Sequence, residues 1–96
     1  MEPEQTRQPA AFSLGRLLIT PAAQAVLTQD DLLTALNRHA RGDWGKVNAD
    51  DRAENDLSVR KGFRILSAYE SSSGEKFWII TEAGREATTV LLPSDY

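Results

Sequence analysis

The chain has 96 residues and contains no cysteine, one histidine and one methionine. The absence of cysteine excludes disulfide bonds and every metal site built from thiolates. No apolar run approaches the roughly 20 residues that a transmembrane helix needs. Residues 1–11 also lack the basic and then apolar order of a secretory signal peptide. We therefore expect a single cytoplasmic domain with no membrane partner.

Several familiar motifs are missing as well. There is no glycine-rich phosphate loop, no nucleophile elbow and no HExxH pattern. The acidic residues do not follow the spacing of an EF-hand loop. We therefore expect neither a cofactor nor a bound metal.

The net charge of −3 is unevenly distributed along the chain. A chain that binds nucleic acid through its overall electrostatic field should be basic, so general nucleic-acid binding is disfavoured. The negative excess falls in residues 43–56, where the acidic Asp43, Asp50, Asp51, Glu54 and Asp56 face only Lys46 and Arg52.

The C-terminal third carries the strongest strand signals. Residues 63–69, 76–81 and 87–92 are rich in aromatic and β-branched side chains. Short turns that contain glycine separate them, which predicts an antiparallel meander. The middle segment is apolar on both faces, so it should be the central strand.

Upstream, residues 1–11 are polar and contain two prolines, which predicts a disordered leader before a domain over residues 12–96. Residues 12–19 are more apolar, and Gly15 favours an extra edge strand over a helix there.

Three helix starts follow, and each is marked by a capping residue. Thr20 precedes Pro21 and a short helix to about Val26. A capping box at Thr28 begins a helix to about Arg41, with an apolar stripe of Leu32, Leu33, Leu36 and Ala40. Asn48 begins a third helix to about Lys61, with a thin apolar face of Ala49, Ala53 and Leu57. The predicted fold is α+β, with two or three helices packed on a three- or four-stranded antiparallel sheet.

Two residues in the second helix and the turn after it have alternative interpretations. His39 is a candidate general acid or base, or a phosphate contact, at a helix end. The alternative is a partly buried histidine that favours the helix C-terminus and hydrogen-bonds a backbone carbonyl. Trp44 is either a core plug that locks the corner between the two helices, with its indole N–H bonded to a nearby carbonyl, or an exposed anchor for a partner.

Two groups of charged residues lead to different functions. The acidic segment is a candidate surface for a basic protein partner, with contacts from Trp44, Asp50, Asp51 and Glu54. Basic residues near the helix end and the sheet are a candidate phosphate cleft of a metal-independent ribonuclease, in which His39 acts with Arg38, Arg41, Lys76 and Arg85. Thr88 and Thr89 lie beside that set.

Four segments, residues 39–45 (HARGDWG), 64–69 (RILSAY), 77–83 (FWIITEA) and 88–93 (TTVLLP), resemble a family of short bacterial proteins encoded on plasmids and other mobile elements. The resemblance spans about residues 14–96 and implies no established activity. Gly84 stands where such relatives carry Asp, so the resemblance assigns no role to that turn. A coarser, fold-level analogy to barnase/RelE/EndoU-like ribonuclease toxins rests on element order, one histidine and scattered basic residues.

Two hypotheses result. The first is a small non-enzymatic accessory protein of a mobile element that binds a protein, such as a CRISPR–Cas or restriction complex of the host. The alternative is the ribonuclease toxin, for which RNA would be the substrate.

Overall fold

The computed structural model of the chain describes residues 10–96, so the leader predicted for residues 1–11 falls almost wholly outside the described residues. The fold is α+β, as predicted, with helices that precede most of the strands. The helices are α1 (Pro21–Val26), α2 (Gln29–Ala40) and α3 (Ala49–Lys61). The strands are β1 (Arg16–Ile19), β2 (Ile65–Glu70), β3 (Lys76–Thr81) and β4 (Ala87–Leu91), with 3₁₀ turns η1 (Ala83–Arg85) and η2 (Pro93–Asp95).

The sheet has the order β1-β4-β3-β2, and the prediction that it is wholly antiparallel is wrong. The meander β2–β3–β4 is antiparallel, but β1 pairs with β4 in the parallel direction. A hairpin forces its two strands to run antiparallel, whereas β1 is connected to the other strands through three helices and is free to run either way. Sequence alternation alone does not encode that direction.

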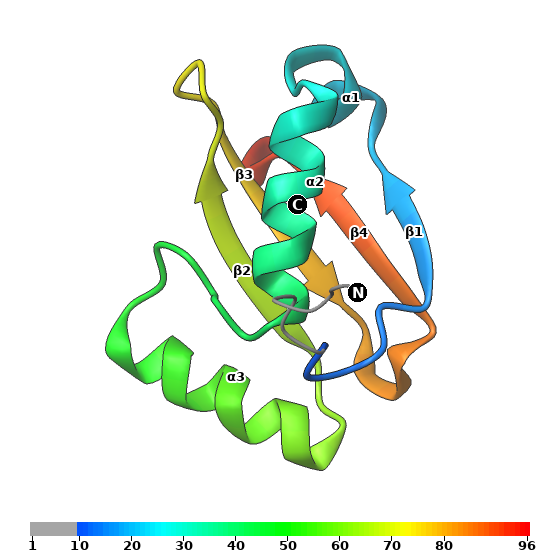
Figure 1. The fold of residues 1–96 in the computed structure, drawn as a ribbon, viewed down its shortest axis with the longest axis vertical. Helices are drawn as coiled ribbons and strands as arrows, with labels where there is room; N and C mark the ends of the chain where they lie inside the picture. The colour runs from blue at the N-terminus through cyan, green and yellow to red at the C-terminus, as the bar shows by residue number, and fades with distance from the viewer. Residues whose placement is uncertain (1–9) are drawn as a thin grey trace, which may run out of the picture.

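Helix α2 lies across one face of the sheet and forms the core with it (Figure 1). The buried cluster joins α1 and α2 to three strands and consists of Ala23, Leu27, Ala35, Tyr69, Phe77, Ile79 and Val90. Strand β3 is an interior strand of the sheet, as its sequence predicted. One face of it is fully buried (Phe77, Ile79 and Thr81), whereas on the other face Ile80 is buried, Trp78 is half-buried and Lys76 is exposed. On the opposite face the C-terminal turn folds back, and Tyr96 meets the edge of Trp78 at a centroid distance of 5.6 Å.

The helix boundaries follow the predicted caps. Thr20, Thr28 and Asn48 each accept a backbone N–H three residues on, and Thr28 forms the full capping box with Asp31. In residues 10–96, no helix is long and apolar enough to cross a membrane.

The predicted apolar faces of two helices need correction. In α2, Leu33 is 54% exposed, while Ala35 and His39 are buried. In α3, Ala49 and Ala53 are exposed, and the residues that face the protein are Asn55 and Ser58. Helix α3 lies beside the β2 edge of the sheet (Figure 1), so hydrogen bonds hold it where an apolar stripe was expected.

Candidate functional site

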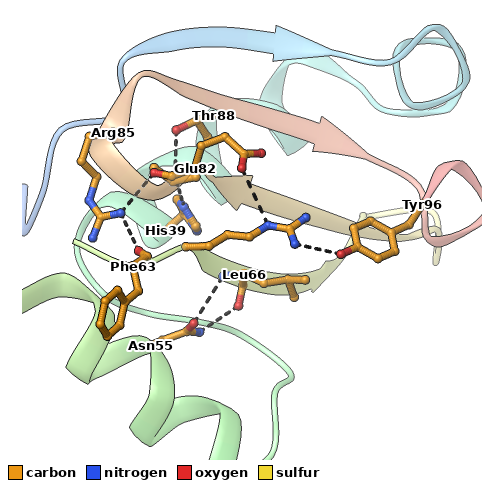
Figure 2. A network of polar contacts seen from close by, with 10 residues as sticks. His39, Asn55, Phe63, Leu66, Glu82, Arg85, Thr88 and Tyr96 are labelled. Carbon is orange, nitrogen blue, oxygen red and sulfur yellow. Dashed lines mark hydrogen bonds and ion pairs between the residues drawn. The ribbon is translucent and has the colours of Figure 1, made fainter. Parts of the chain in front are cut away.

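His39 lies in the last turn of α2, and its side chain is entirely buried against the sheet. Its Nδ1 atom contacts the hydroxyl of Ser67 on β2, and its Nε2 atom lies 2.8 Å from Thr81 Oγ1 on β3. Thr81 Oγ1 in turn lies 2.7 Å from Thr88 Oγ1 on β4. The Thr88 hydroxyl donates to the carbonyl oxygen of Leu14 at 2.6 Å. These contacts form one chain of hydrogen bonds across the three antiparallel strands, part of which appears in Figure 2.

This series of hydrogen bonds determines which nitrogen of His39 carries the proton. Because Thr88 donates to a carbonyl, its oxygen must accept from the Thr81 hydroxyl. Thr81 therefore accepts from His39, which places the imidazole proton on Nε2. Nδ1 is then unprotonated and accepts from the Ser67 hydroxyl. Every polar atom of the neutral ring is satisfied.

The environment of His39 favours this neutral form. Burial, and then the nearby positive charge of Arg85, lower the pKa of His39 from its ordinary value of 6.5 to about 4. A general base must reach a proton on its substrate, but the ring of His39 has 0% exposed surface. The arrangement corresponds to the structural interpretation of His39, with two differences: the ring is fully rather than partly buried, and its partners are the hydroxyls of Ser67 and Thr81 rather than a backbone carbonyl.

Trp44 is buried as well, with 3% of its surface exposed. Its ring meets His39 edge-on at a centroid distance of 5.8 Å and lies 6.0 Å from the ring of Phe12. The indole N–H donates to the Asp56 carboxylate of α3 at 2.9 Å. Trp44 is therefore the core plug of the two alternatives, although its indole N–H bonds a carboxylate and not the predicted carbonyl. Its ring is not part of an open contact surface.

Asn55 attaches α3 to the edge of the sheet. Its amide nitrogen donates to the carbonyl oxygen of Leu66 at 2.8 Å, and its amide oxygen accepts from the Leu66 N–H at 3.3 Å (Figure 2). The side chain thus occupies the place that a neighbouring strand would take. Sequence reasoning missed Asn55, although a polar residue centred in a helix with almost no apolar face was a usable signal.

Arg85 holds the other end of α3. Its guanidinium donates to the carbonyl oxygens of Phe63 at 2.7 Å and Glu82 at 3.2 Å (Figure 2). It also donates to the carbonyl oxygen of Ser58 at 2.6 Å. The same group lies 5.4 Å from the ring centroid of Phe12. Arg85 was a candidate for phosphate binding, but its donors are directed at backbone carbonyls of the fold.

The remaining basic candidates do not converge. Arg38 pairs with Asp43 at 2.7 Å and lies over the Tyr69 ring. Arg41 is exposed at the C-terminal end of α2. Lys76 begins β3 and Arg85 follows its other end, so the strand separates them by roughly 17 Å at about 3.4 Å per residue. Among the described residues, Lys76 therefore lies at the opposite end of β3 from Arg85, so the five residues of the ribonuclease alternative do not meet at one place.

A shallow groove of about 400 Å³ runs between α2 and the β2–β3 turn. Asp31 lies in it and bonds the N–H of Ser72, and this bond and the helix cap lower its pKa. Burial raises the pKa of Tyr69 to about 12. The charges that line the groove are mixed in sign (Asp30, Asp31, Arg38 and Glu70). Within residues 10–96, no three side chains suited to metal binding come together.

The acidic residues of α3 remain accessible. Asp50, Asp51 and Glu54 are all exposed, and the first eight residues of the helix carry four acidic side chains against one basic. We call Asp50, Asp51 and Glu54 the acidic face. The helix is attached to the protein through Asn55, Asp56 and Ser58, and none of these belongs to the acidic face.

Comparison with known proteins adds no further assignment. No family model, no curated protein and no solved structure matches the chain.

Proposed function

We propose that the protein acts by binding another protein through the acidic face of α3, and that it is not an enzyme. The observation that carries this proposal is the way in which α3 is attached. Side-chain and backbone hydrogen bonds at Asn55 and Ser58 fix the helix, while Asp50, Asp51 and Glu54 point away from the sheet into solvent. A fixed helix whose three exposed carboxylates form no ion pair within residues 10–96 presents a preorganised surface, which reduces the entropic cost of binding.

The charge of this face indicates the chemistry of the partner. A negative surface steers a partner with a positive one and fixes its orientation. Complexes that hold nucleic acid carry such positive surfaces, because they must neutralise phosphates. The resemblance to proteins of plasmids and other mobile elements supports the same partner class, which is a host defence complex such as a CRISPR–Cas or restriction assembly.

Trp44 has an indirect role in binding. Because its indole N–H bonds Asp56, it holds α3 at a fixed distance from the core. It therefore positions the acidic face without contacting the partner.

The test uses two aspartates in equivalent places. Asp50 and Asp30 are both exposed and both occupy the second position of their helices, so lysine at either site costs the helix a similar amount. The tagged full-length chain is incubated with host lysate, and the captured protein is identified and purified. Its affinity is then measured by calorimetry for Asp50→Lys and Asp30→Lys.

We expect Asp50→Lys to weaken binding about tenfold, equivalent to about 1.4 kcal/mol, with less effect at high salt. Asp30→Lys should leave the affinity within about twofold. Equal affinities for Asp50→Lys and the unaltered chain would contradict the proposal, and loss of binding only in Asp30→Lys would move the site to the groove beside α2. RNA cleavage by the purified chain that disappears in His39→Ala would support the ribonuclease alternative instead.

A further inference from the structure

The two edges of the sheet are finished in different ways. At the β2 edge, Lys46 donates its N–H to the Ala68 carbonyl at 2.7 Å, and Ala68 donates to the Trp44 carbonyl at 3.1 Å. Asn55 satisfies Leu66 on the same edge. At the β1 edge no segment of residues 10–96 pairs with the strand. Exposed strand edges of this kind are templates for pairing with another chain.

Alternation along β1 shows which backbone groups face outward. The N–H of Arg16 donates to the carbonyl of Glu86, just before β4, and the N–H of Thr20 donates to the carbonyl of Val90 in β4, each at 3.0 Å. Neighbouring residues in a strand direct their backbone groups to opposite sides. The N–H and C=O groups of Leu17 and Ile19 therefore point to the open edge. Leucine side chains flank them, with Leu17 54% exposed and Leu18 41% exposed.

We propose that a second copy of the chain binds here, by antiparallel pairing of β1 with β1 about a two-fold axis through Leu18. In this register Leu17 faces Ile19 of the second copy, and the reciprocal pair forms on the other side of the axis. Both pairs join residues with outward backbone groups, so each exchanges two hydrogen bonds. The two Leu18 side chains meet at the axis. The four-stranded sheets become one continuous eight-stranded sheet.

The charges near the strand complement one another in the same register. Arg16 lies opposite Thr20 of the second copy. The Thr20 hydroxyl donates to Asp95 Oδ2 at 2.6 Å, and the Leu92 N–H bonds the same oxygen at 3.0 Å. Within residues 10–96, Oδ1 of Asp95 accepts no hydrogen bond and Arg16 forms no ion pair. The two-fold axis therefore brings each Arg16 guanidinium towards the Asp95 carboxylate of the other copy.

The apolar surface and the net charge also favour a second copy. An apolar depression of about 150 Å³ borders β1 and is lined by Leu17, Leu18, Ile19, Leu32, Leu36 and Val90. Because Ile19 pairs with Leu17 of the second copy, the side chain of that leucine would lie beside the apolar depression. The acidic α3 lies beside the opposite edge of the sheet (Figure 1), so pairing through β1 places the two negative helices at the far ends of the dimer.

A first experiment measures mass by sedimentation equilibrium over a wide concentration range. Leu17 and Leu33 are both 54% exposed, but only Leu17 lies on the edge, so Leu17→Lys has a matched control in Leu33→Lys. We expect a monomer–dimer equilibrium, a dissociation constant at least tenfold higher for Leu17→Lys and one within twofold for Leu33→Lys. A chain that stays monomeric at every concentration overturns the proposal and leaves residues 1–9 or a different protein as the occupant of the edge.

A second experiment tests the register. The chain has no cysteine, so Leu18→Cys introduces a single thiol. The Leu18 pair at the axis is not hydrogen-bonded, and its Cα atoms should lie about 4.5 Å apart, within the range of a disulfide. Mild oxidation should cross-link Leu18→Cys but not the control Leu33→Cys, although Leu33 is the more exposed of the two positions, at 54% against 41%. A dimer in which Leu18→Cys does not cross-link, or does so no faster than Leu33→Cys, overturns the register.

The ion pairs provide a third measurement, which is independent of the leucines. Arg16→Glu should weaken the dimer several-fold because it faces Asp95 of the other copy, and Asp95→Lys should weaken it similarly. The double variant exchanges the two charges and should recover most of the loss. Failure of the double variant to recover, with both single variants folded by circular dichroism, contradicts the proposed contact. None of these outcomes depends on the acidic face of α3.

Discussion

The Nε2 atom of His39 donates to the Oγ1 atom of Thr81 across 2.8 Å, deep between α2 and the centre of the sheet. The contact determines the role of the chain's one histidine. Thr81 donates to Thr88, and Thr88 donates to the backbone carbonyl of Leu14, so the hydrogen-bond network ends inside the protein. His39 thus attaches the end of α2 to the sheet. The sequence had left open whether this residue is catalytic or structural.

The buried histidine predicts a pH-dependent stability. The folded state holds His39 at a pKa of about 4, whereas the unfolded chain has the ordinary value of 6.5, so the unfolded state binds more protons between these values. The stability that comes from the neutral His39 should therefore be fully present above pH 6.5 and should fall as the pH decreases towards 4. The expected loss is about 3 kcal/mol, of which about 2 kcal/mol appears before pH 5. Urea unfolding at pH 7.5, 6.5, 5.5 and 5.0 measures it.

The control for this prediction is His39→Gln, whose amide can donate and accept but does not titrate. Its stability should be nearly constant from pH 7.5 to pH 5, because carboxylates have ordinary pKa values near 4 and titrate mainly below that range. A wild-type protein with the same flat profile would show that His39 is not desolvated in the folded state.

The attachment of α3 predicts the effect of Asn55→Ala. The substitution removes both hydrogen bonds to Leu66 and leaves a partly buried N–H and C=O without partners. We expect a loss of about 1–3 kcal/mol in the free energy of unfolding and faster hydrogen exchange at the Leu66 amide. Asn37→Ala is the control, since Asn37 is exposed on α2. If exchange at Leu66 does not change, the edge is protected by something other than Asn55.

Two glycines with positive φ separate backbone strain from steric clash. A Cβ added at Gly45 would lie 2.1 Å from the Ala68 carbonyl oxygen, and φ there is +74°. At Gly74 φ is +90°, with no atom within 4 Å of the added Cβ. Gly74→Ala should cost about 1–2 kcal/mol from the backbone alone. Gly45→Ala should cost about 3 kcal/mol or more, because it also displaces the bridge that seals β2. Thermal unfolding compares the two losses of stability. Equal losses would mean that the backbone at Ala68 moves away from the added Cβ at little cost.

Much of the fold follows from local sequence signals, and the exceptions are non-local. Capping residues such as Thr28 act within one turn, so the helix boundaries were predictable from their neighbours. The direction of β1 depends on a partner about seventy residues away, and no local pattern records it. In α3, the packing face is chosen by hydrogen bonds to Leu66, so an apolar-periodicity rule selected Ala49 and Ala53 wrongly.

In the candidate site as well, some features were predictable from local sequence and others depend on tertiary contacts. The exposure of the acidic segment followed from its composition, since adjacent carboxylates are rarely buried together. The burial of Trp44 did not follow, because its environment is made by Phe12, His39 and Asp56 from three different segments. The sequence offered two interpretations of Trp44 and of His39, and in each case only tertiary contacts distinguish them.

The link between Trp44 and α3 gives the last prediction. Trp44→Phe keeps an aromatic ring against His39 but removes the N–H that donates to Asp56. The Asp56 carboxylate is exposed and can return to water, so the cost should be modest, about 1 kcal/mol. Trp78→Phe is the control on the other face of the sheet, where no indole hydrogen bond to residues 10–96 is lost.

A double-mutant cycle isolates the contact itself. If the hydrogen bond couples the two residues, Trp44→Phe and Asp56→Ala together should cost less than the sum of the two single variants, with an interaction energy of about 1 kcal/mol. Strict additivity in urea unfolding would mean that the bond contributes nothing to stability. The orientation of the acidic face would then come from the hydrogen bonds of Asn55 and Arg85.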